Sequence, residues 1–384
     1  MIAVVTRTPD APDESPARRP VDTGHYLLLL AMVVVMLILA ELFTRSCVHY
    51  GTEVQIGFGA TRLDDRVVEA AFEEDPELTW RLRRDMRFPE RDFPLRGILA
   101  NSQGLRAPRL VAPKKGANEI RILFVGDSVT FGWRVSHNET ISKRAEVRLA
   151  AIYPELKITC MNAGVPGYSL FQGWKYLETA GMRFEPDLVV VSFGVNDGMS
   201  WSDLSDFQHY ERLQAIRVPP ALRFSQLAGL FYTATNRKII APDYVNRPRL
   251  TLPEFHDLLE RVKGFVTARN ADLLLMTQAL AGEFDGSEAA ASHNHYQSEM
   301  ARFGGAFFLG PGREPAWIDA TSVLRILAAE RPGESLFFDH VHPTRIGYEA
   351  LAEAVAERLE PWIENRMRSR HDDSERPAAA EQSS

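Results

Sequence analysis

Segments of strand length alternate with segments of helix length from Arg121 almost to the C-terminus, and this alternation restricts the chain to few folds. The clearest segment is Leu188 to Phe193, a nearly continuous apolar run of the kind that a strand buried on both faces requires. Such alternation predicts an α/β fold in which a central, mostly parallel sheet has helices on both faces. The other predicted strands are Arg121–Val125, Leu156–Met161, Leu273–Met276 and Ala316–Ile318, and the predicted helices between them are Glu139–Ile152, Leu170–Gly181 and Leu252–Ala268.

Two local patterns strengthen the helix predictions. Thr251 and Glu254 form a capping box directly at the start of the helix predicted from Leu252. Apolar residues at helical spacing mark one face of a long C-terminal helix, at Leu351, Val355, Leu359 and Ile363. Residues 198–250 show no such periodicity, and we expect them to be irregular.

A separate apolar segment lies near the N-terminus. Tyr26 to Ala40 contains no charge, and a helix counted to Phe43 would rise about 27 Å, close to the hydrocarbon thickness of a bilayer. A cleaved signal peptide is the alternative, but cleavage after Ala40 would place Ile38 where a small residue is preferred. The sequence therefore predicts an uncleaved transmembrane signal anchor, with residues 26–43 in the membrane.

Basic residues indicate the orientation of this anchor. Arg7, Arg18 and Arg19 precede the apolar segment, whereas Arg45 alone follows it closely. The positive-inside rule then places the N-terminus in the cytoplasm. We expect the body of a single-pass protein to be extracytoplasmic, on the periplasmic side if the cell is Gram-negative.

Composition excludes several other classes. With 45% hydrophobic and 25% charged residues, the bulk of the chain is typical of a globular protein rather than a polytopic membrane protein. The net charge is −7 and the basic residues are scattered, so no nucleic-acid partner is expected.

Two cysteines, Cys47 and Cys160, cannot form a disulfide framework or a cysteine zinc site. The pair His293 and His295 lacks a third ligand, so no metal is expected.

Four short motifs carry polar residues at positions where parallel sheets place their sites, the carboxyl ends of strands. Gly126 to Gly132 follows the first strand and holds Ser128 at a strand-to-helix turn. Asn162 to Gly167 follows the second strand, and Gly194 to Asp197 follows the third. Each of these alone is equally typical of an ordinary turn or a helix N-cap.

The fourth motif, Asp339 to Pro343, precedes the last helix. Asp339 and His342 are three residues apart, a spacing that can put both side chains on one side of a loop. The carboxylate can then accept from Nδ1–H and hold Nε2 toward a nucleophile. A capping aspartate beside a surface histidine is the alternative.

In these four blocks the chain resembles the SGNH hydrolases, also called GDSL lipases and esterases. Ser128, Gly164, Asn196 and His342 stand in the order that defines the family, each beside the expected strand or helix. Val129 replaces the leucine of the family's name-giving motif, a packing position. The resemblance covers about residues 119–366, and it implies a three-layer α/β/α sandwich of flavodoxin-like type. The segment before the matched region, with Asp75-Pro76-Glu77-Leu78 and Asn101 to Arg106, also looks like that of membrane-anchored bacterial members.

The resemblance assigns roles to individual residues. Ser128 would be the nucleophile, His342 the general base and then acid, and Asp339 the group that orients the imidazole. The oxyanion hole would consist of the Ser128 N–H, the Gly164 N–H and the Asn196 side-chain amide. His340 also neighbours Asp339 but has the wrong spacing for the motif, and no cofactor is needed.

These roles imply a serine esterase that removes an acyl group from oxygen through an acyl-serine intermediate, acting on an acetylated glycan, a lipid or a small ester. An O-acyltransferase acting on an extracytoplasmic polysaccharide would use the same residues. A catalytically silent binding or assembly module of this fold is the alternative from another class. Oligomeric state is not indicated.

The expected organisation follows. Residues 1–24 form a disordered tail, 25–45 the anchor, 46–118 a juxtamembrane segment that packs on the catalytic domain, 119–366 the catalytic domain, and 367–384 a disordered tail. Aromatic residues in the insertion after the third block either shape an acyl or alcohol pocket or form a small core of their own, and these are Trp201, Phe207, Tyr210, Phe224, Phe231 and Tyr232.

Overall fold

The structure is a computed structural model, and it describes residues 23–47, 71–88, 97, 99–200, 204–215, 224–236, 247–285, 294–310 and 314–375. The chain divides into two compact units, each considered by itself. Residues 1–52 and 218–237 form the N-terminal unit, and residues 53–217 with 238–384 form the main unit. Trp201 and His293 lie outside the described residues, as do residues 1–22 and 376–384.

A five-stranded parallel sheet forms the centre of the main unit, in the order β4-β3-β5-β6-β7. Its strands agree with the five predicted from the sequence to within two residues at each end, so the α/β prediction is confirmed. Their bounds are β3 (Glu119–Gly126), β4 (Lys157–Asn162), β5 (Leu188–Ser192), β6 (Asp272–Met276) and β7 (Trp317–Ile318). All residues of β5 are buried, as its apolar sequence requires.

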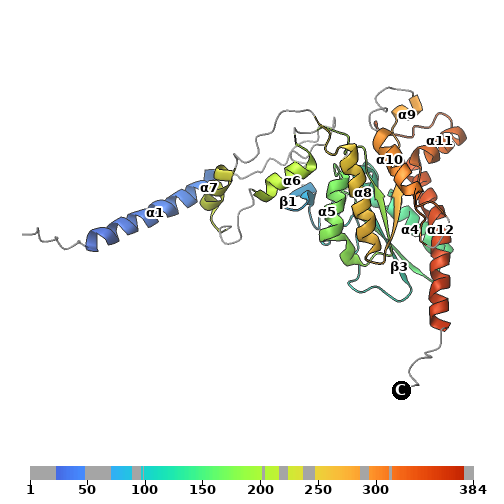
Figure 1. The fold of residues 1–384 in the computed structure, drawn as a ribbon, viewed down its shortest axis with the longest axis horizontal. Helices are drawn as coiled ribbons and strands as arrows, with labels where there is room; N and C mark the ends of the chain where they lie inside the picture. The colour runs from blue at the N-terminus through green and yellow to red at the C-terminus, as the bar shows by residue number, and fades with distance from the viewer. Residues whose placement is uncertain are drawn as a thin grey trace, which may run out of the picture. The chain divides into compact units, whose positions relative to one another are not determined.

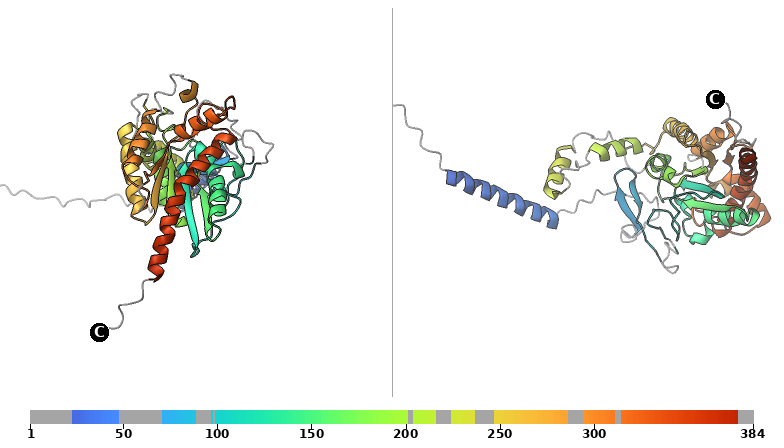
Figure 2. Two further views of the ribbon diagram at one scale, coloured as in Figure 1. Left: turned by 90° about the vertical axis from the view of Figure 1, so that its right-hand side faces the viewer. Right: turned by 90° about the horizontal axis from the view of Figure 1, so that it is seen from below.

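Helices cover both faces of this sheet and make three layers (Figures 1 and 2). One face carries α5 (Leu170–Thr179), α8 (Leu252–Thr267) and α10 (Asn294–Gly305). The other carries α4 (Ile141–Ile152), α11 (Ala320–Glu330) and α12 (Arg345–Glu375). The capping box predicted for α8 is present, with the Thr251 and Glu254 side chains each bonded to the other's backbone N–H. Shorter helical segments are α3 (Ser128–Phe131), η1 (His137–Glu139), η2 (Gly181–Phe184) and α9 (Gly282–Asp285).

Two segments are more helical than the sequence indicated. The helix α12 continues to Glu375, past residue 367, where a disordered tail was predicted. Its polar end has no apolar stripe to reveal it, and the Arg368–Glu364 ion pair, one turn apart, supports the helix there. The prediction of an irregular 198–250 segment is likewise wrong where α6 (Asp206–Ala215) and α7 (Gln226–Asn236) form.

The aromatic residues of this insertion separate into two groups. Phe207 and Tyr210 of α6 pack edge-on against Phe171, with ring centroids 4.7 and 5.6 Å away, so these two extend the core of the main unit. Phe224 and Phe231, at 76% and 72% exposure, belong instead to the N-terminal unit. The periodicity of a short helix does not reveal whether its aromatic residues pack in the core of the main unit or belong to the N-terminal unit.

A short hairpin precedes the sheet and packs on it. β1 (Phe72–Asp75) pairs antiparallel with β2 (Thr79–Leu82). Trp80 of β2 is buried, and its indole N–H donates to the Pro166 carbonyl at 3.2 Å. The Tyr168 hydroxyl donates to the Trp80 carbonyl at 2.5 Å. The hairpin therefore shares one apolar core with the sheet's α5 face and supports the loop after β4.

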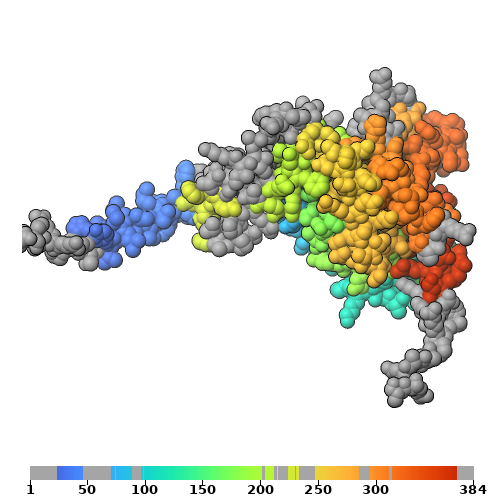
Figure 3. All heavy atoms as spheres, viewed as in Figure 1, coloured from blue at the N-terminus to red at the C-terminus, as the bar shows by residue number. Residues whose placement is uncertain are grey.

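The N-terminal unit contains α1 (Thr23–Cys47) and α7. Within α1, Gly24–Arg45 is long and apolar enough to cross a membrane, and almost none of its most apolar stretch is buried in the protein. α7 lies against the C-terminal part of α1 (Figure 3).

Candidate active site

The four sequence motifs meet at one edge of the sheet. Phe124 of β3 pairs with Asn162 at the end of β4, and Gly126 pairs with Ser192 at the end of β5. The loops that follow these three strands therefore start within two residues of one another along the sheet. This is the carboxyl edge, where open α/β sheets place their sites.

Ser128 begins α3, a single helical turn directly after β3. Asp127 caps this turn by accepting from the Val129 N–H at 2.9 Å. The cap fixes the chain at the point where it reverses from strand to helix, and the Ser128 side chain stays partly exposed while its neighbours are buried.

A hydrogen-bonded relay leads from this serine to an aspartate. The Ser128 Oγ lies 2.8 Å from His342 Nε2. The other ring nitrogen, Nδ1, lies 2.8 Å from each carboxylate oxygen of Asp339. Serine, imidazole and carboxylate are thus within hydrogen-bond reach in the order that activates a hydroxyl. Trp133 packs beside the imidazole, with ring centroids 6.1 Å apart.

The carboxylate of Asp339 also binds backbone N–H groups of its own loop. Asp339 Oδ1 accepts from the backbone N–H groups of Val341 and His342 at 3.1 and 3.0 Å, and this tight turn brings two side chains three residues apart together. Burial would raise the pKa of Asp339, but donation from His342 and from these N–H groups outweighs it and holds that pKa well below its usual range. His340 is exposed, and His342 rather than His340 faces Ser128.

The two other oxyanion candidates flank α3. A Cβ on Gly164 would lie 2.3 Å from the Phe131 nitrogen, so only glycine lets this backbone approach the helix so closely. The Gly164 N–H donates to the Asn162 side chain at 3.0 Å. The Asn196 amide donates to Asp127 at 3.1 Å and to the Tyr168 carbonyl at 3.0 Å. Both donors therefore already have acceptors within the protein.

Comparison with known proteins shows the family of this chain. The family model of the GDSL-like lipase/acylhydrolase family matches residues 124–350, more than half of the chain. The chain belongs to the GDSL-like lipase/acylhydrolase family. It is accordingly a hydrolase that acts on ester bonds.

Solved structures with a similar fold share little sequence with this GDSL-like hydrolase. An acetylxylan esterase from Geobacillus stearothermophilus is 17% identical, with a TM-score of 0.42 over 63% of this chain and 94% of that one. A lipase/acylhydrolase from Enterococcus faecalis is 19% identical, with a TM-score of 0.40 over 63% and 96%. An alpha/beta hydrolase from the metagenome of Lake Arreo is 15% identical, with a TM-score of 0.43 over 62% and 94%. A search of curated protein sequences found no significant match.

Sequence reasoning missed Gln278, which follows β6 at the same edge of the GDSL-like domain. It is buried, and its side-chain N–H donates to Asp127 Oδ1 at 2.8 Å while its Oε1 accepts from Val195 N–H at 3.2 Å. Burial raises the pKa of Asp127 to about 6, and donation from Gln278 is the largest opposing influence. In the sequence, the one indication of a role for Gln278 was its position just after the apolar strand that ends at Met276.

Asp197 stabilises the loop that carries Asn196. Its two carboxylate oxygens accept from the N–H groups of Leu170 and Gly194 at 2.7 and 2.8 Å. Burial raises the pKa of Asp197 to about 7. Gly194 has φ +122°, a conformation that side chains rarely adopt, and a Cβ there would lie 2.4 Å from the Gln297 amide.

Arg106 was also missed. Its guanidinium is fully buried and donates to the carbonyls of Phe131, Gly132 and Val135, the last at 2.5 Å. These carbonyls end the helical turn that begins at Ser128, so Arg106 fixes the far end of α3. Burial lowers the pKa of Arg106 to about 9.

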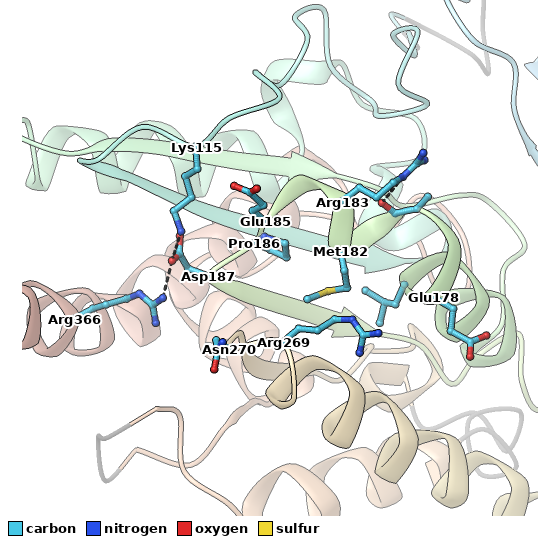
Figure 4. Close-up of a pocket in the computed structure, with 12 residues that line it drawn as sticks. Lys115, Glu178, Met182, Arg183, Glu185, Pro186, Asp187, Arg269, Asn270 and Arg366 are labelled. Atoms are coloured by element: carbon cyan, nitrogen blue, oxygen red, sulfur yellow. Dashed lines mark hydrogen bonds and ion pairs between the residues drawn. The ribbon is translucent and has the colours of Figure 1, made fainter.

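A polar pocket lies at the opposite, amino edge of the sheet (Figure 4). Its centre is Asp187, 1% exposed, which directly precedes β5. Lys115 and Arg366 both reach Asp187 at 2.6 Å, and the Arg121 backbone N–H donates to it at 2.9 Å. The pocket contains none of the candidate catalytic residues. Its ion pairs join α12 and the segment before β3 to Asp187 at the start of β5. Within the described residues, no group of His, Cys, Asp and Glu side chains can hold a metal ion.

Proposed function

We propose that Ser128 is the nucleophile of a two-step ester hydrolysis. The observation that carries this proposal is the relay of 2.8 Å contacts from Ser128 through His342 to Asp339. A serine hydroxyl is a weak nucleophile until a base lies beside it, and the relay supplies that base. The three residues come from the first and last blocks of the family motif, far apart in the sequence.

In the first step, His342 Nε2 takes the hydroxyl proton as Ser128 Oγ attacks the ester carbonyl. The C–O bond of the ester then breaks, and the imidazolium returns the proton to the leaving alcohol. In the second step, His342 takes a proton from water as the water attacks the acyl carbonyl. The bond from that carbon to Ser128 Oγ then breaks, the imidazolium returns the proton to Oγ, and the acid product leaves. Asp339 stays ionised throughout because its pKa is held low, so it stabilises the imidazolium in both steps.

The negative charge on the carbonyl oxygen requires donors. The Ser128 and Gly164 N–H groups and the Asn196 amide are the proposed set, and each such donor contributes a factor of about 10² to 10³ in turnover. We propose that the oxyanion takes over the Gly164 hydrogen that the Asn162 side chain accepts. It likewise takes over the Asn196 hydrogen that the Tyr168 carbonyl accepts, while the bond to Asp127 keeps the amide in place.

We propose further that residues 26–43 anchor the enzyme in a membrane, with the N-terminus cytoplasmic and the catalytic domain extracytoplasmic. The length and apolar composition of Gly24–Arg45 support the span. The arginines before the segment support the orientation. An ester-bearing glycan or lipid outside the cytoplasm fits this location.

Comparison of two serine variants tests the mechanism. The full chain with Ser128→Ala should lose hydrolysis of short-chain p-nitrophenyl esters by at least three orders of magnitude. Ser322→Ala, at an exposed position on α11, should keep full activity. Equal turnover in both variants would contradict the nucleophile assignment. Release of nitrophenol only when a polysaccharide acceptor is present would identify an acyltransferase instead.

A further inference from the structure

The apolar helix α1 contains one carboxylate, Glu41, and its bonding explains its presence there. Glu41 accepts from the Ser225 hydroxyl at 2.8 Å and from the backbone N–H groups of Gln226 and Leu227, both at 2.9 Å. These N–H groups belong to the first turn of α7, where no preceding carbonyl can accept them. Glu41 thus caps α7 from another helix. A carboxylate is costly in a membrane-spanning helix, and these donors offset the cost of burying it there.

Arg45, one turn further along α1, completes the attachment. Its Nε donates to Glu41 at 2.8 Å, and its Nη2 donates to the Phe224 carbonyl at 2.8 Å. The start of α7 is therefore held at two successive turns of α1. Both turns belong to the end of the predicted membrane span, where apolar helix gives way to polar sequence.

The composition of α7 suits the surface of a bilayer. Its sequence from Gln226 to Asn236, QLAGLFYTATN, contains no charged residue. Phe231 is 72% exposed, and Phe224, just before the helix, is 76% exposed. On α1, Phe43 is 66% exposed in the same unit. Aromatic side chains concentrate at the interface between lipid and water, the depth at which α1 ends.

We propose that residues 224–236 form an interfacial helix that rests in the headgroup layer of the membrane beside the end of α1. The inference rests on the proposed membrane anchor and goes beyond it, because it assigns a second lipid contact to a segment in the middle of the chain. The partner is the lipid surface, since α7 is fixed to a helix whose own side chains are exposed along the span. The lack of charge makes this contact apolar, so it should not require anionic lipid.

The consequence concerns the insertion between α6 and α8 (Leu252–Thr267). Its central helix groups with the anchor rather than with the catalytic domain. The insertion is then a second tether to the membrane, in addition to the chain that follows α1.

Site-directed spin labelling of the full chain tests this. In a Cys47→Ala, Cys160→Ala background, single labels are placed by Phe231→Cys on α7, Val35→Cys on α1 and Val147→Cys on α4. Val35 and Val147 are both exposed, and Val147 belongs to the main unit. The labelled protein is reconstituted at one copy per phosphatidylcholine nanodisc. Collision rates with oxygen, which concentrates in lipid, and with a water-soluble nickel chelate are then measured.

The expected result is oxygen-favoured labels at 35 and 231 and a nickel-favoured label at 147. Adding Glu41→Leu should move the label at 231 toward water and leave the label at 35 unchanged. A nickel-favoured label at 231 with an oxygen-favoured label at 35 would overturn the interfacial helix alone. A nickel-favoured label at 35 would overturn the anchor beneath it. Shielding of 231 from both reagents would show that protein covers α7, which also overturns the proposal.

Discussion

Replacing Gln278 by methionine should move the acid limb of the pH profile of kcat to higher pH. The substitution removes no residue of the relay from Ser128 to Asp339. Gln278 is the main donor that opposes the burial of Asp127, whose pKa burial raises to about 6. A hydrogen bond to a charged group contributes about 1.5 to 3 kcal/mol, and each pH unit corresponds to about 1.4 kcal/mol. The limb should therefore move by about 1 to 2 pH units.

The direction of this movement depends on which protonation state of Asp127 holds the Asn196 amide in place. A proton on Asp127 removes the negative charge that strengthens its hydrogen bond from the Asn196 amide, so the proposed oxyanion donor is held less firmly. At pH 7 the wild-type carboxylate is largely ionised, whereas in the variant it should be about half to one-tenth ionised. We expect kcat to fall about 2- to 10-fold at pH 7 and to recover near pH 9.

The assay is hydrolysis of a short-chain ester followed by pH-stat between pH 5 and 9, with the rate of Ser128→Ala subtracted. Gln172→Met is the matched control, because Gln172 is an equally buried glutamine that bonds to the Leu78 carbonyl on the α5 face. The control should lose stability but keep the wild-type profile. A Gln278→Met profile that has the wild-type shape, even at reduced height, would refute this reasoning.

Four further substitutions have outcomes that the contacts determine. Asp339→Asn should reduce kcat by about 10⁴ with the fold retained, as checked by circular dichroism, because an amide cannot stabilise the imidazolium; a loss below tenfold would contradict its role. Gly164→Ala should reduce kcat by about 10² to 10³, because its Cβ would lie 2.3 Å from the Phe131 nitrogen, and unchanged kcat would show that this backbone does not serve the site. Asp187→Ala should lower the free energy of unfolding by about 3 kcal/mol in urea titrations, since it leaves two cations without their buried partner. Glu364→Ala, which breaks an exposed pair, should cost less than about 1 kcal/mol by the same measurement.

The fold could be predicted because the central strands of the sheet, β3 and β5, are short and mostly apolar runs whose residues are all buried. Leu188–Phe193 and Arg121–Val125 correspond closely to β5 and β3. The α6 and α7 helices could not be predicted in the same way. α6 packs on Phe171 through two aromatic residues, and α7 begins on a carboxylate that lies more than 180 residues earlier in the chain. Such partners leave no local pattern.

The site divides in a similar manner. Ser128, Asp339 and His342 were found because their motifs have fixed spacing and lie beside predicted elements. Gln278 and Arg106 act on α3 and its cap from distant segments. Gln278 stands in no motif, and the lead-in stretch that ends at Arg106 assigned no role to that residue. Their polar groups are fully buried, a property that composition and periodicity do not report. Supporting residues of this kind become visible only when the packing is known.

The central claim is that an acyl group is carried on Ser128. The most direct measurement is to quench the full chain with acid during turnover of a p-nitrophenyl ester and to map the acyl group by peptide mass spectrometry. We expect a mass increase equal to the acyl group on the peptide that contains Ser128, and none in the Ser128→Ala variant. Steady release of nitrophenol with the acyl group on another residue, or with wild-type rates in Ser128→Ala, would contradict it.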